Sequence, residues 1–233
     1  THAFHVALMK GFILLASVIG SIALEAKVQV EANFPGGSVV VDELDEEART
    51  LRFRPMNYKN KGWACWWYFK VSGLKPGEIW KLSLQGSGFA VPKRASVSSD
   101  GKTWKHSAPG KRSGKLHTYE IEVPAQTTWF AWGPTFVLAD AKRLVENTAK
   151  AKVGAKAYVL CKSQEGHEVP ALRWEPEGNG KQPAVWIQAR QHAWEAGSSW
   201  VCQGLVEWLA SDQKDAVKLR ETARIHVVPI MDV

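Results

Sequence analysis

Residues 27–132 are divided into short apolar and aromatic runs, and this division restricts the possible folds of the chain more than any other feature. Turn-forming residues such as Pro35-Gly36-Gly37 and Lys75-Pro76-Gly77 separate the runs, and none of the runs is long enough for a stable helix. Frequent short strands between turns are typical of two packed antiparallel sheets. The sequence therefore predicts an antiparallel β-sandwich over residues 27–134. The predicted strands are 28–31, 38–41, 50–54, 65–71, 79–84, 94–98, 118–123 and 128–132.

One turn in this segment has a specific expected geometry. Asp100-Gly101 lies between the apolar-polar alternation of 95–98 and residues 102–104. An Asp-Gly pair between two strands favours a two-residue type I′ hairpin turn. The sequence predicts such a hairpin here.

The pattern changes near Pro134, where a domain boundary is expected. Leu138, Ala141, Leu144 and Val145 recur at helical spacing. Beyond them, 157–161, 183–189 and 224–231 are predicted to be buried strands, and 196–210 an amphipathic helix. Strand, helix and strand in this order favour a parallel α/β sheet with the helix on one face. The residues expected to face the sheet are Val201, Leu205, Trp208 and Leu209, with Val206 at the edge. The predicted fold class is thus all-β (27–134) followed by α/β (135–233).

Residues 1–26 have the pattern of a secretory signal peptide. Lys10 follows Met9, and the uninterrupted apolar run 11–24 leads to the small residue Ala26. The run is shorter than the roughly 20 residues that a spanning helix needs. We therefore expect a periplasmic or secreted mature chain with no stable membrane insertion. The alternative is a buried N-terminal segment in a cytoplasmic protein.

Charge and cysteine content exclude some functional classes. The 30 Lys and Arg residues exceed the 23 Asp and Glu residues, giving a net charge of +7, but they are scattered, so no nucleic-acid partner is predicted. Cys65, Cys161 and Cys202 form no C-x-x-C pair, so neither a thiolate zinc site nor a redox motif is expected. These cysteines are buried thiols or include one disulfide. The oligomeric state is left open.

The candidate chemistry lies directly after the predicted strand 183–189. His192 and Glu195 are three residues apart, so both side chains can project to one side of the first turn of the next helix. Ligands of open α/β sheets bind beyond the carboxyl ends of strands. An imidazole nitrogen and a carboxylate oxygen are both suitable zinc ligands. The spacing alone favours solvation or a local ion pair, and the apolar strand before the pair and the small residues 196–199 after it raise the zinc interpretation to an equal footing.

Several segments resemble zinc carboxypeptidases of the M14 type, in the branch similar to cytosolic carboxypeptidases. In that branch a β-sandwich precedes an α/β peptidase domain. In the turn 163–167, His167 stands where the family commonly has an arginine, and we interpret it as a solvated residue rather than a ligand. The segments that carry the resemblance are 66–71, 163–167, 192–195 and 227–233.

The resemblance implies that His192 and Glu195 bind Zn²⁺ in an enzyme that removes the last residue of a peptide or protein. The family uses two histidines and one glutamate as zinc ligands. Its second histidine, its catalytic glutamate and its carboxylate-binding residues come after the strand that here ends at Val233. His226 lies in an apolar run, where a buried histidine bonded to backbone is favoured over a ligand. The sequence therefore predicts an inactive piece of a longer enzyme.

A carbohydrate-binding or adhesion module attached to an inactive peptidase-like domain is the alternative. Twelve tryptophans suggest it, seven of them at 63, 66, 67, 80, 104, 129 and 132. Trp66 and Trp67 are adjacent on a predicted strand, so one must face inward and the other outward. Large aromatic residues more often fill cores or interfaces. Arg190 is expected to form a surface salt bridge in preference to attracting an anionic substrate.

Overall fold

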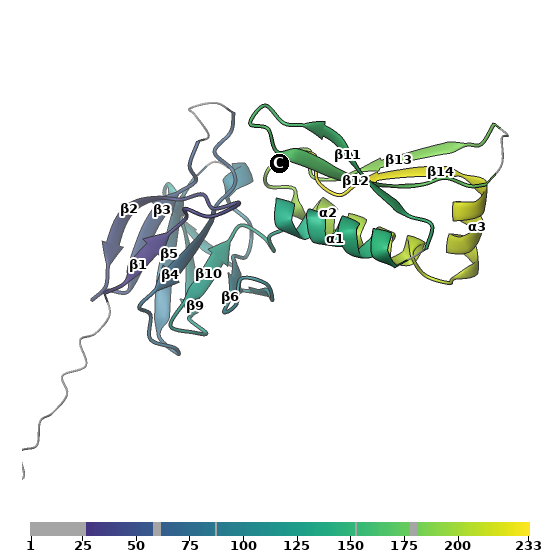
Figure 1. The fold of residues 1–233 in the computed structure, drawn as a ribbon. Helices are drawn as coiled ribbons and strands as arrows, with labels where there is room; N and C mark the ends of the chain where they lie inside the picture. The colour runs from purple at the N-terminus through teal and green to yellow at the C-terminus, as the bar shows by residue number, and fades with distance from the viewer. Residues whose placement is uncertain (1–26, 58–61, 87, 152, 178–180) are drawn as a thin grey trace, which may run out of the picture.

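The computed structural model describes residues 27–57, 62–86, 88–151, 153–177 and 181–233. The predicted signal peptide lies outside these residues. The chain forms a β-rich region, 27–132, and an α/β region, 138–233 (Figure 1). None of the helices within the described residues has the length and apolar character needed to cross a membrane.

The β-rich region contains two five-stranded sheets. The first has the order β1 (Gln29–Glu31), β4 (Tyr68–Ser72), β10 (Thr128–Ala131), β6 (Ser96–Ser98) and β7 (Lys105–His106). The second has the order β2 (Val40–Asp45), β3 (Thr50–Arg54), β5 (Ile79–Gln85), β9 (Leu116–Glu122) and β8 (Lys111–Ser113). A 3₁₀ turn, η1 (Gly88–Ala90), follows β5.

The two sheets enclose one core between them. Phe69 and Phe130 of the first sheet meet Phe53, Leu82 and Tyr119 of the second, and each is at most 1% exposed. The alternating apolar and polar residues of these strands therefore point alternately into this core and toward the outer face of their sheet. Phe53 packs edge-to-face on Phe69 with ring centroids 4.9 Å apart, a favourable aromatic geometry.

Two expectations for this region are wrong in detail. The sheets are not wholly antiparallel, because β3 and β5 pair in parallel. The Asp100-Gly101 segment is not a two-residue hairpin, since Ser96 pairs with His106 and Val97 with Lys105, which leaves a longer loop. The Asp100 carboxylate organises that loop by accepting hydrogen bonds from the backbone N–H groups of residues 102 and 103. A local side-chain bond has replaced the tight turn.

The α/β region is a four-stranded mixed sheet with helices on one face. Its elements are α1 (Leu138–Lys150), β11 (Lys156–Lys162), β12 (Glu168–Trp174), β13 (Ala184–Gln188), α2 (Ala196–Leu209), α3 (Lys214–Thr222) and β14 (Arg224–Val228). The strand order is β11-β12-β14-β13, and only β13 and β14 pair in parallel. Figure 1 shows α1 and α2 along the same side of the sheet.

The face of α2 that packs on the sheet agrees with the prediction in part, because Leu209 is buried and Leu205 and Trp208 pack against the core, but Val201 does not. Val201 is 75% exposed, whereas Ser199, Cys202 and Val206 are buried. Small side chains let the helix approach the sheet closely. Since apolar residues surround most of α2, hydrophobicity alone does not identify its buried face.

The predicted burial of the strands 157–161 and 183–189 is also wrong. They form β11 and β13, the two edge strands of the sheet. Most residues of each strand are exposed. The central strand β12, in contrast, was not predicted. Its Pro170 interrupts the pattern of a central strand, although most of β12 is buried.

The cysteines form no disulfide. Cys65 and Cys202 are buried and Cys161 is exposed. Burial raises the pKa of Cys202 to about 11, so its thiol stays protonated at neutral pH.

Candidate metal centre

The candidate site begins where β13 and β14 end side by side. Ala189 donates its N–H to the carbonyl of Val228 at 2.9 Å, and Met231 donates back to the carbonyl of Ala189 at 3.1 Å. Asp232 donates its N–H to the carbonyl of Arg190 at 3.0 Å. These bonds extend the parallel pairing past the strands and fix the start of the segment 190–195.

Arg190 turns the chain out of the sheet with a positive φ of 47°, a conformation that non-glycine residues adopt at a cost. Its guanidinium is buried rather than on the surface, and it donates to the carbonyl of Phe136 at 2.5 Å. Burial lowers the pKa of Arg190, and the negative charges of Asp232 and Asp140 offset part of this effect by raising the pKa. The predicted surface salt bridge is therefore wrong, and Arg190 helps to hold the turn.

His192 and Glu195 lie in the turn that precedes α2, with Glu195 directly before the helix, and not in its first helical turn as predicted. His192 Nδ1 is 3.0 Å from Glu195 Oε1, and the two side chains are 58% and 40% exposed. Glu195 donates its N–H to the His192 carbonyl at 3.0 Å, which closes the turn. The structure thus brings together the two residues that the sequence singles out.

Hydrogen bonds from α2 stabilise this turn. Ser198 Oγ donates to the carbonyl of Glu195 and accepts the N–H of Arg190, both at 2.7 Å. Buried Ser199 donates its Oγ–H to the carbonyl of Pro229 at 2.7 Å. The first turn of α2 is therefore connected both to the candidate pair and to the segment after β14.

The contact between His192 and Glu195 is the local ion pair expected from the sequence as the alternative, and its geometry is also compatible with two ligands of a zinc ion. Two donor atoms that each lie about 2.1 Å from one tetrahedral ion are about 3.4 Å apart. The separation of His192 Nδ1 and Glu195 Oε1, 3.0 Å, needs to open by only a few tenths of an ångström to reach that value. Both side chains are open to solvent, so an ion has access to them.

Within the described part of the chain, no three His, Cys, Asp or Glu side chains converge as a metal-binding group. His226 is half-buried on β14, where its Nδ1 is 3.0 Å from the hydroxyl of Tyr158 and its ring stacks on Trp186. Its partner is thus a side chain and not the backbone that the sequence suggested. His167 lies in the exposed turn after β11.

An aromatic stack that the sequence does not reveal joins the pair to the β-rich region. The ring of His192 stacks on Trp194 with centroids 5.1 Å apart and an interplanar angle of 16°. Trp194 stacks on Trp63 at 6.2 Å and 18°, and Trp63 stacks on Phe89 at 5.2 Å and 14°. Trp194 stands inside the candidate motif, which is a sequence signal, but nothing in the sequence connects it to Trp63.

The other tryptophans of the β-rich region mostly fill space. Trp67 is fully buried in the core between the sheets, and its neighbour Trp66 is buried on the opposite side in a cluster with Trp194. The predicted inward and outward orientations are confirmed, with the outward indole covered as well. Trp63 is the exposed one, and it stacks on two other rings.

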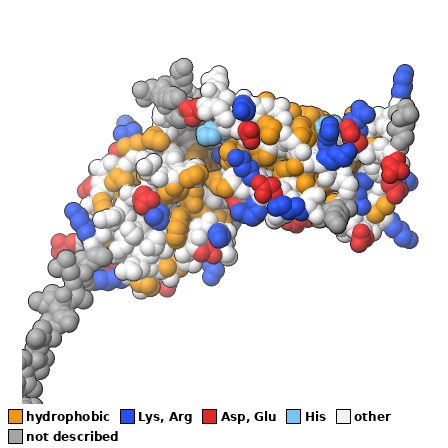
Figure 2. All heavy atoms as spheres, in the orientation of Figure 1, with side chains coloured by type: hydrophobic (Ala, Val, Ile, Leu, Met, Phe, Trp, Pro, Cys, Tyr) orange, Lys and Arg blue, Asp and Glu red, His pale blue; other side chains and the backbone are white. Residues whose placement is uncertain are grey.

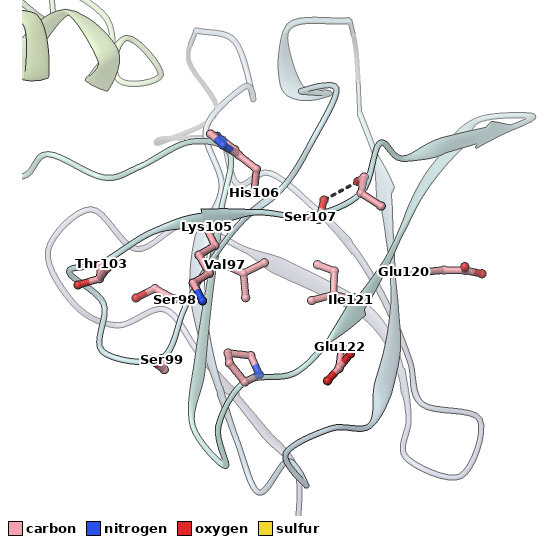
Figure 3. Close-up of a pocket in the computed structure, with 12 residues that line it drawn as sticks. Val97, Ser98, Ser99, Thr103, Lys105, His106, Ser107, Glu120, Ile121 and Glu122 are labelled. Atoms are coloured by element: carbon pink, nitrogen blue, oxygen red, sulfur yellow. Dashed lines mark hydrogen bonds between the residues drawn. The ribbon is translucent and has the colours of Figure 1, made fainter.

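A separate cavity of about 310 Å³ opens at the edge of the two sheets, between β7 and β9 (Figure 3). Val97 and Ile121 point toward each other across it, whereas His106 and Glu120 point away. No tryptophan, tyrosine or phenylalanine is among its described lining residues. It offers neither a metal-binding set nor an aromatic surface for a carbohydrate.

Charge shows no concentration at one place on the face drawn in Figure 2. Basic and acidic side chains are interspersed over both regions there. The net charge of +7 is therefore spread out on this face.

The family model of zinc carboxypeptidases matches residues 143–233. An uncharacterized protein of Zymomonas mobilis is 29% identical over 212 residues, which cover 88% of this chain and 53% of that protein. Human cytosolic carboxypeptidase 1 is 24% identical, over 72% of this chain and 17% of that protein. The chain thus spans about half of the bacterial relative and a much smaller share of the human one.

Solved structures share the fold. A metallo-carboxypeptidase from Burkholderia cenocepacia superimposes with a TM-score of 0.78 at 22% identity, covering 88% of this chain and 56% of that one. A metallo-carboxypeptidase from Pseudomonas aeruginosa gives 0.75 at 23% identity, covering 87% of this chain and 55% of that one. The similarity extends over both regions, so the predicted fold class is confirmed.

Proposed function

We propose that this chain, which resembles M14-type zinc carboxypeptidases of the cytosolic-like branch, carries part of a zinc site that hydrolyses the last peptide bond of a peptide or protein. The proposal assigns zinc binding to His192 and Glu195. The third zinc ligand and the general base would come from residues outside the part of the chain that the structure describes. The observation that carries the proposal is the 3.0 Å approach of His192 Nδ1 to Glu195 Oε1 at the carboxyl end of a parallel strand pair.

The residues of this chain would act by holding and orienting the metal. A zinc ion with an open coordination position lowers the pKa of a bound water and polarises a carbonyl. His192 would supply a neutral nitrogen and Glu195 a carboxylate oxygen from the same side of the turn. The bonds of Ser198 to Glu195 and Arg190 would keep that turn in place.

Zinc titration of the whole chain by calorimetry tests the assignment. We expect weak, saturable binding of one Zn²⁺ ion, because two protein ligands replace the usual three. His192→Gln and Glu195→Gln should each abolish saturable binding. His167→Gln is the matched control, since it removes an exposed histidine from a different turn, the one after β11. Equal zinc affinity in wild type and His192→Gln would refute the assignment.

The chain on its own should show no peptidase activity on C-terminal substrates, because two of the family's zinc ligands are not the complete set. Peptide hydrolysis followed by mass spectrometry measures this directly. Robust, zinc-dependent turnover by the 233 residues would contradict this part of the proposal.

The location of the protein in the cell is a separate proposal. The signal-like residues 1–26 support export, whereas the relatives named cytosolic carboxypeptidases favour the cytoplasmic alternative. N-terminal sequencing of the protein from fractionated cells distinguishes them. A mature chain that begins at residue 27 outside the cytoplasm supports export, and an uncleaved chain inside it refutes export.

A further inference from the structure

The β-rich region reaches the candidate metal centre through the stack of four rings. His192, Trp194, Trp63 and Phe89 are stacked in this order, with interplanar angles of 14° to 18°. Two members come from the loop after β13 and two from the β-rich region. The stack therefore crosses between the two regions.

The far end of the stack is anchored by the β-rich region. Trp132 donates its indole N–H to the carbonyl of Phe89 at 2.9 Å, and Trp67 donates its indole N–H to the carbonyl of Ala90 at 2.9 Å. Both indoles are fixed by their own packing, since Trp67 is fully buried and Trp132 packs against the core. Phe89 is thus held in place although its side chain is 59% exposed.

The near end of the stack has little other support. The side chain of His192 is 58% exposed, and among the described contacts its ring is held by Glu195 and by the face of Trp194. Glu195 is itself the second candidate ligand, so it would turn toward the metal. The remaining control on the imidazole plane is Trp194, which packs with Ala193 on the β-rich region and stacks on Trp63.

We propose that Trp63 is a positioning residue for His192, acting through Trp194, so that the β-rich region helps to set the geometry of the metal centre. A histidine that binds a metal is normally oriented by a hydrogen bond from its other nitrogen. Here ring stacking would do part of this work by limiting rotation of the imidazole plane. The metal-affinity part of this inference rests on the proposed zinc site, whereas the orientation of the ring does not.

The experiment compares three variants of the whole chain by NMR of the histidine rings without metal, and then by zinc titration. Trp63→Ala removes the stacked ring, and Trp63→Phe restores an aromatic face. Trp186→Ala is the matched control, because Trp186 is an indole that is 50% exposed and stacks on a different histidine, His226. The ring signals of His192 are identified by their loss in His192→Gln.

In wild type, we expect upfield-shifted ring signals for His192, because protons above an aromatic face experience its ring current. Trp63→Ala should move these signals toward those of a free histidine, Trp63→Phe should leave them near wild type, and Trp186→Ala should move only those of His226. Outer partners of metal ligands typically affect affinity about 10–100-fold, and Trp63 acts through one more ring, so we expect Trp63→Ala to weaken zinc binding about threefold.

The outcomes separate this inference from the zinc assignment. If His192 ring signals in Trp63→Ala stay at their wild-type positions, the positioning role is refuted, even if thermal unfolding shows a loss of stability. If the signals move but no variant binds zinc, the orientation is supported and the zinc site itself fails. The exposure of Trp63, 68%, makes loss of folding in Trp63→Ala unexpected, and circular dichroism checks this.

Discussion

The two regions bury their sheets in different ways. In the β-rich region, two sheets cover each other and share one core. In the α/β region, α1 and α2 cover one face of a four-stranded sheet. The opposite face, called the open face below, carries a small buried cluster of Val169, Ala171 and Val228 and the half-exposed side chain of Trp186 beside His226. A strand of the β-rich region therefore buries one face against another sheet, whereas a strand of the α/β region buries one face against a helix.

This difference explains which residues the open face carries. Tyr158 bonds to His226, and the indole N–H of Trp186 donates to Gln188 Oε1 at 3.0 Å. Arg173 lies 5.9 Å from the ring centre of Tyr158, within range of a cation–π contact. Tyr158, His226, Trp186 and Gln188 on this face thus pair with one another, whereas the core of the β-rich region is almost entirely apolar.

The largest effect should come from the core between the two sheets. Phe69→Ala removes a fully buried ring that contacts rings of both sheets, so we expect a loss of about 3–5 kcal/mol in unfolding free energy. Ile79→Ala is the control, because Ile79 lies on β5 but is 59% exposed. Urea unfolding measures both. A loss below 1 kcal/mol for Phe69→Ala would contradict the enclosed core.

A smaller loss is expected from the α/β region at Ser199. Ser199→Ala leaves the buried carbonyl of Pro229 without its 2.7 Å partner, which should cost about 1–3 kcal/mol. The matched change Thr222→Ala removes an exposed hydroxyl-to-carbonyl bond of 2.7 Å and should cost less. If the two variants unfold at the same urea concentration, the connection of α2 to the segment after β14 is unimportant for stability.

The open face should tolerate change better still. Trp186→Ala removes an indole that is half exposed, and surface changes usually stay within about 0.5 kcal/mol. Some loss is expected because the ring stacks on His226. Thermal unfolding provides the measurement. A loss comparable with that of Phe69→Ala would show that this face is as important as the enclosed core.

The smallest effect concerns pH and the loop after β6. Backbone N–H groups of residues 103 and 102 hold the pKa of Asp100 below its usual range. A carboxylate with a lowered folded-state pKa contributes stability above its unfolded pKa of about 4, and this contribution is lost as the pH falls through the folded pKa. Asp100→Asn should remove this acid sensitivity. Amide exchange of residues 102 and 103 across this range tests it, and identical profiles in both proteins would contradict it.

The parts of the fold that the sequence predicted are those in which local pattern and burial coincide. The strand 50–54 was predicted with its observed bounds, because each inward residue is apolar and each outward one polar. The face of α2 was predicted only in part, with Val201 placed wrongly, because apolar residues occur all round it. The parallel pairing of β3 with β5 depends on contacts between distant segments, which local spacing does not encode.

The candidate site was predictable to a similar extent. The spacing of His192 and Glu195 is local, and the structure brings their side chains together. The contribution of Trp63 was not predictable, because its contact with Trp194 depends on how the two regions pack. The buried position of Arg190 likewise follows from its distant partner Phe136.

X-ray absorption at the zinc edge tests the central claim most directly, because it reports the atoms bound to the ion. For the whole chain loaded with one equivalent of Zn²⁺, the account predicts one imidazole nitrogen and one carboxylate oxygen at about 2.0–2.2 Å, with the imidazole signal lost in His192→Gln and the carboxylate signal altered in Glu195→Gln. An unchanged imidazole signal in His192→Gln would contradict the account.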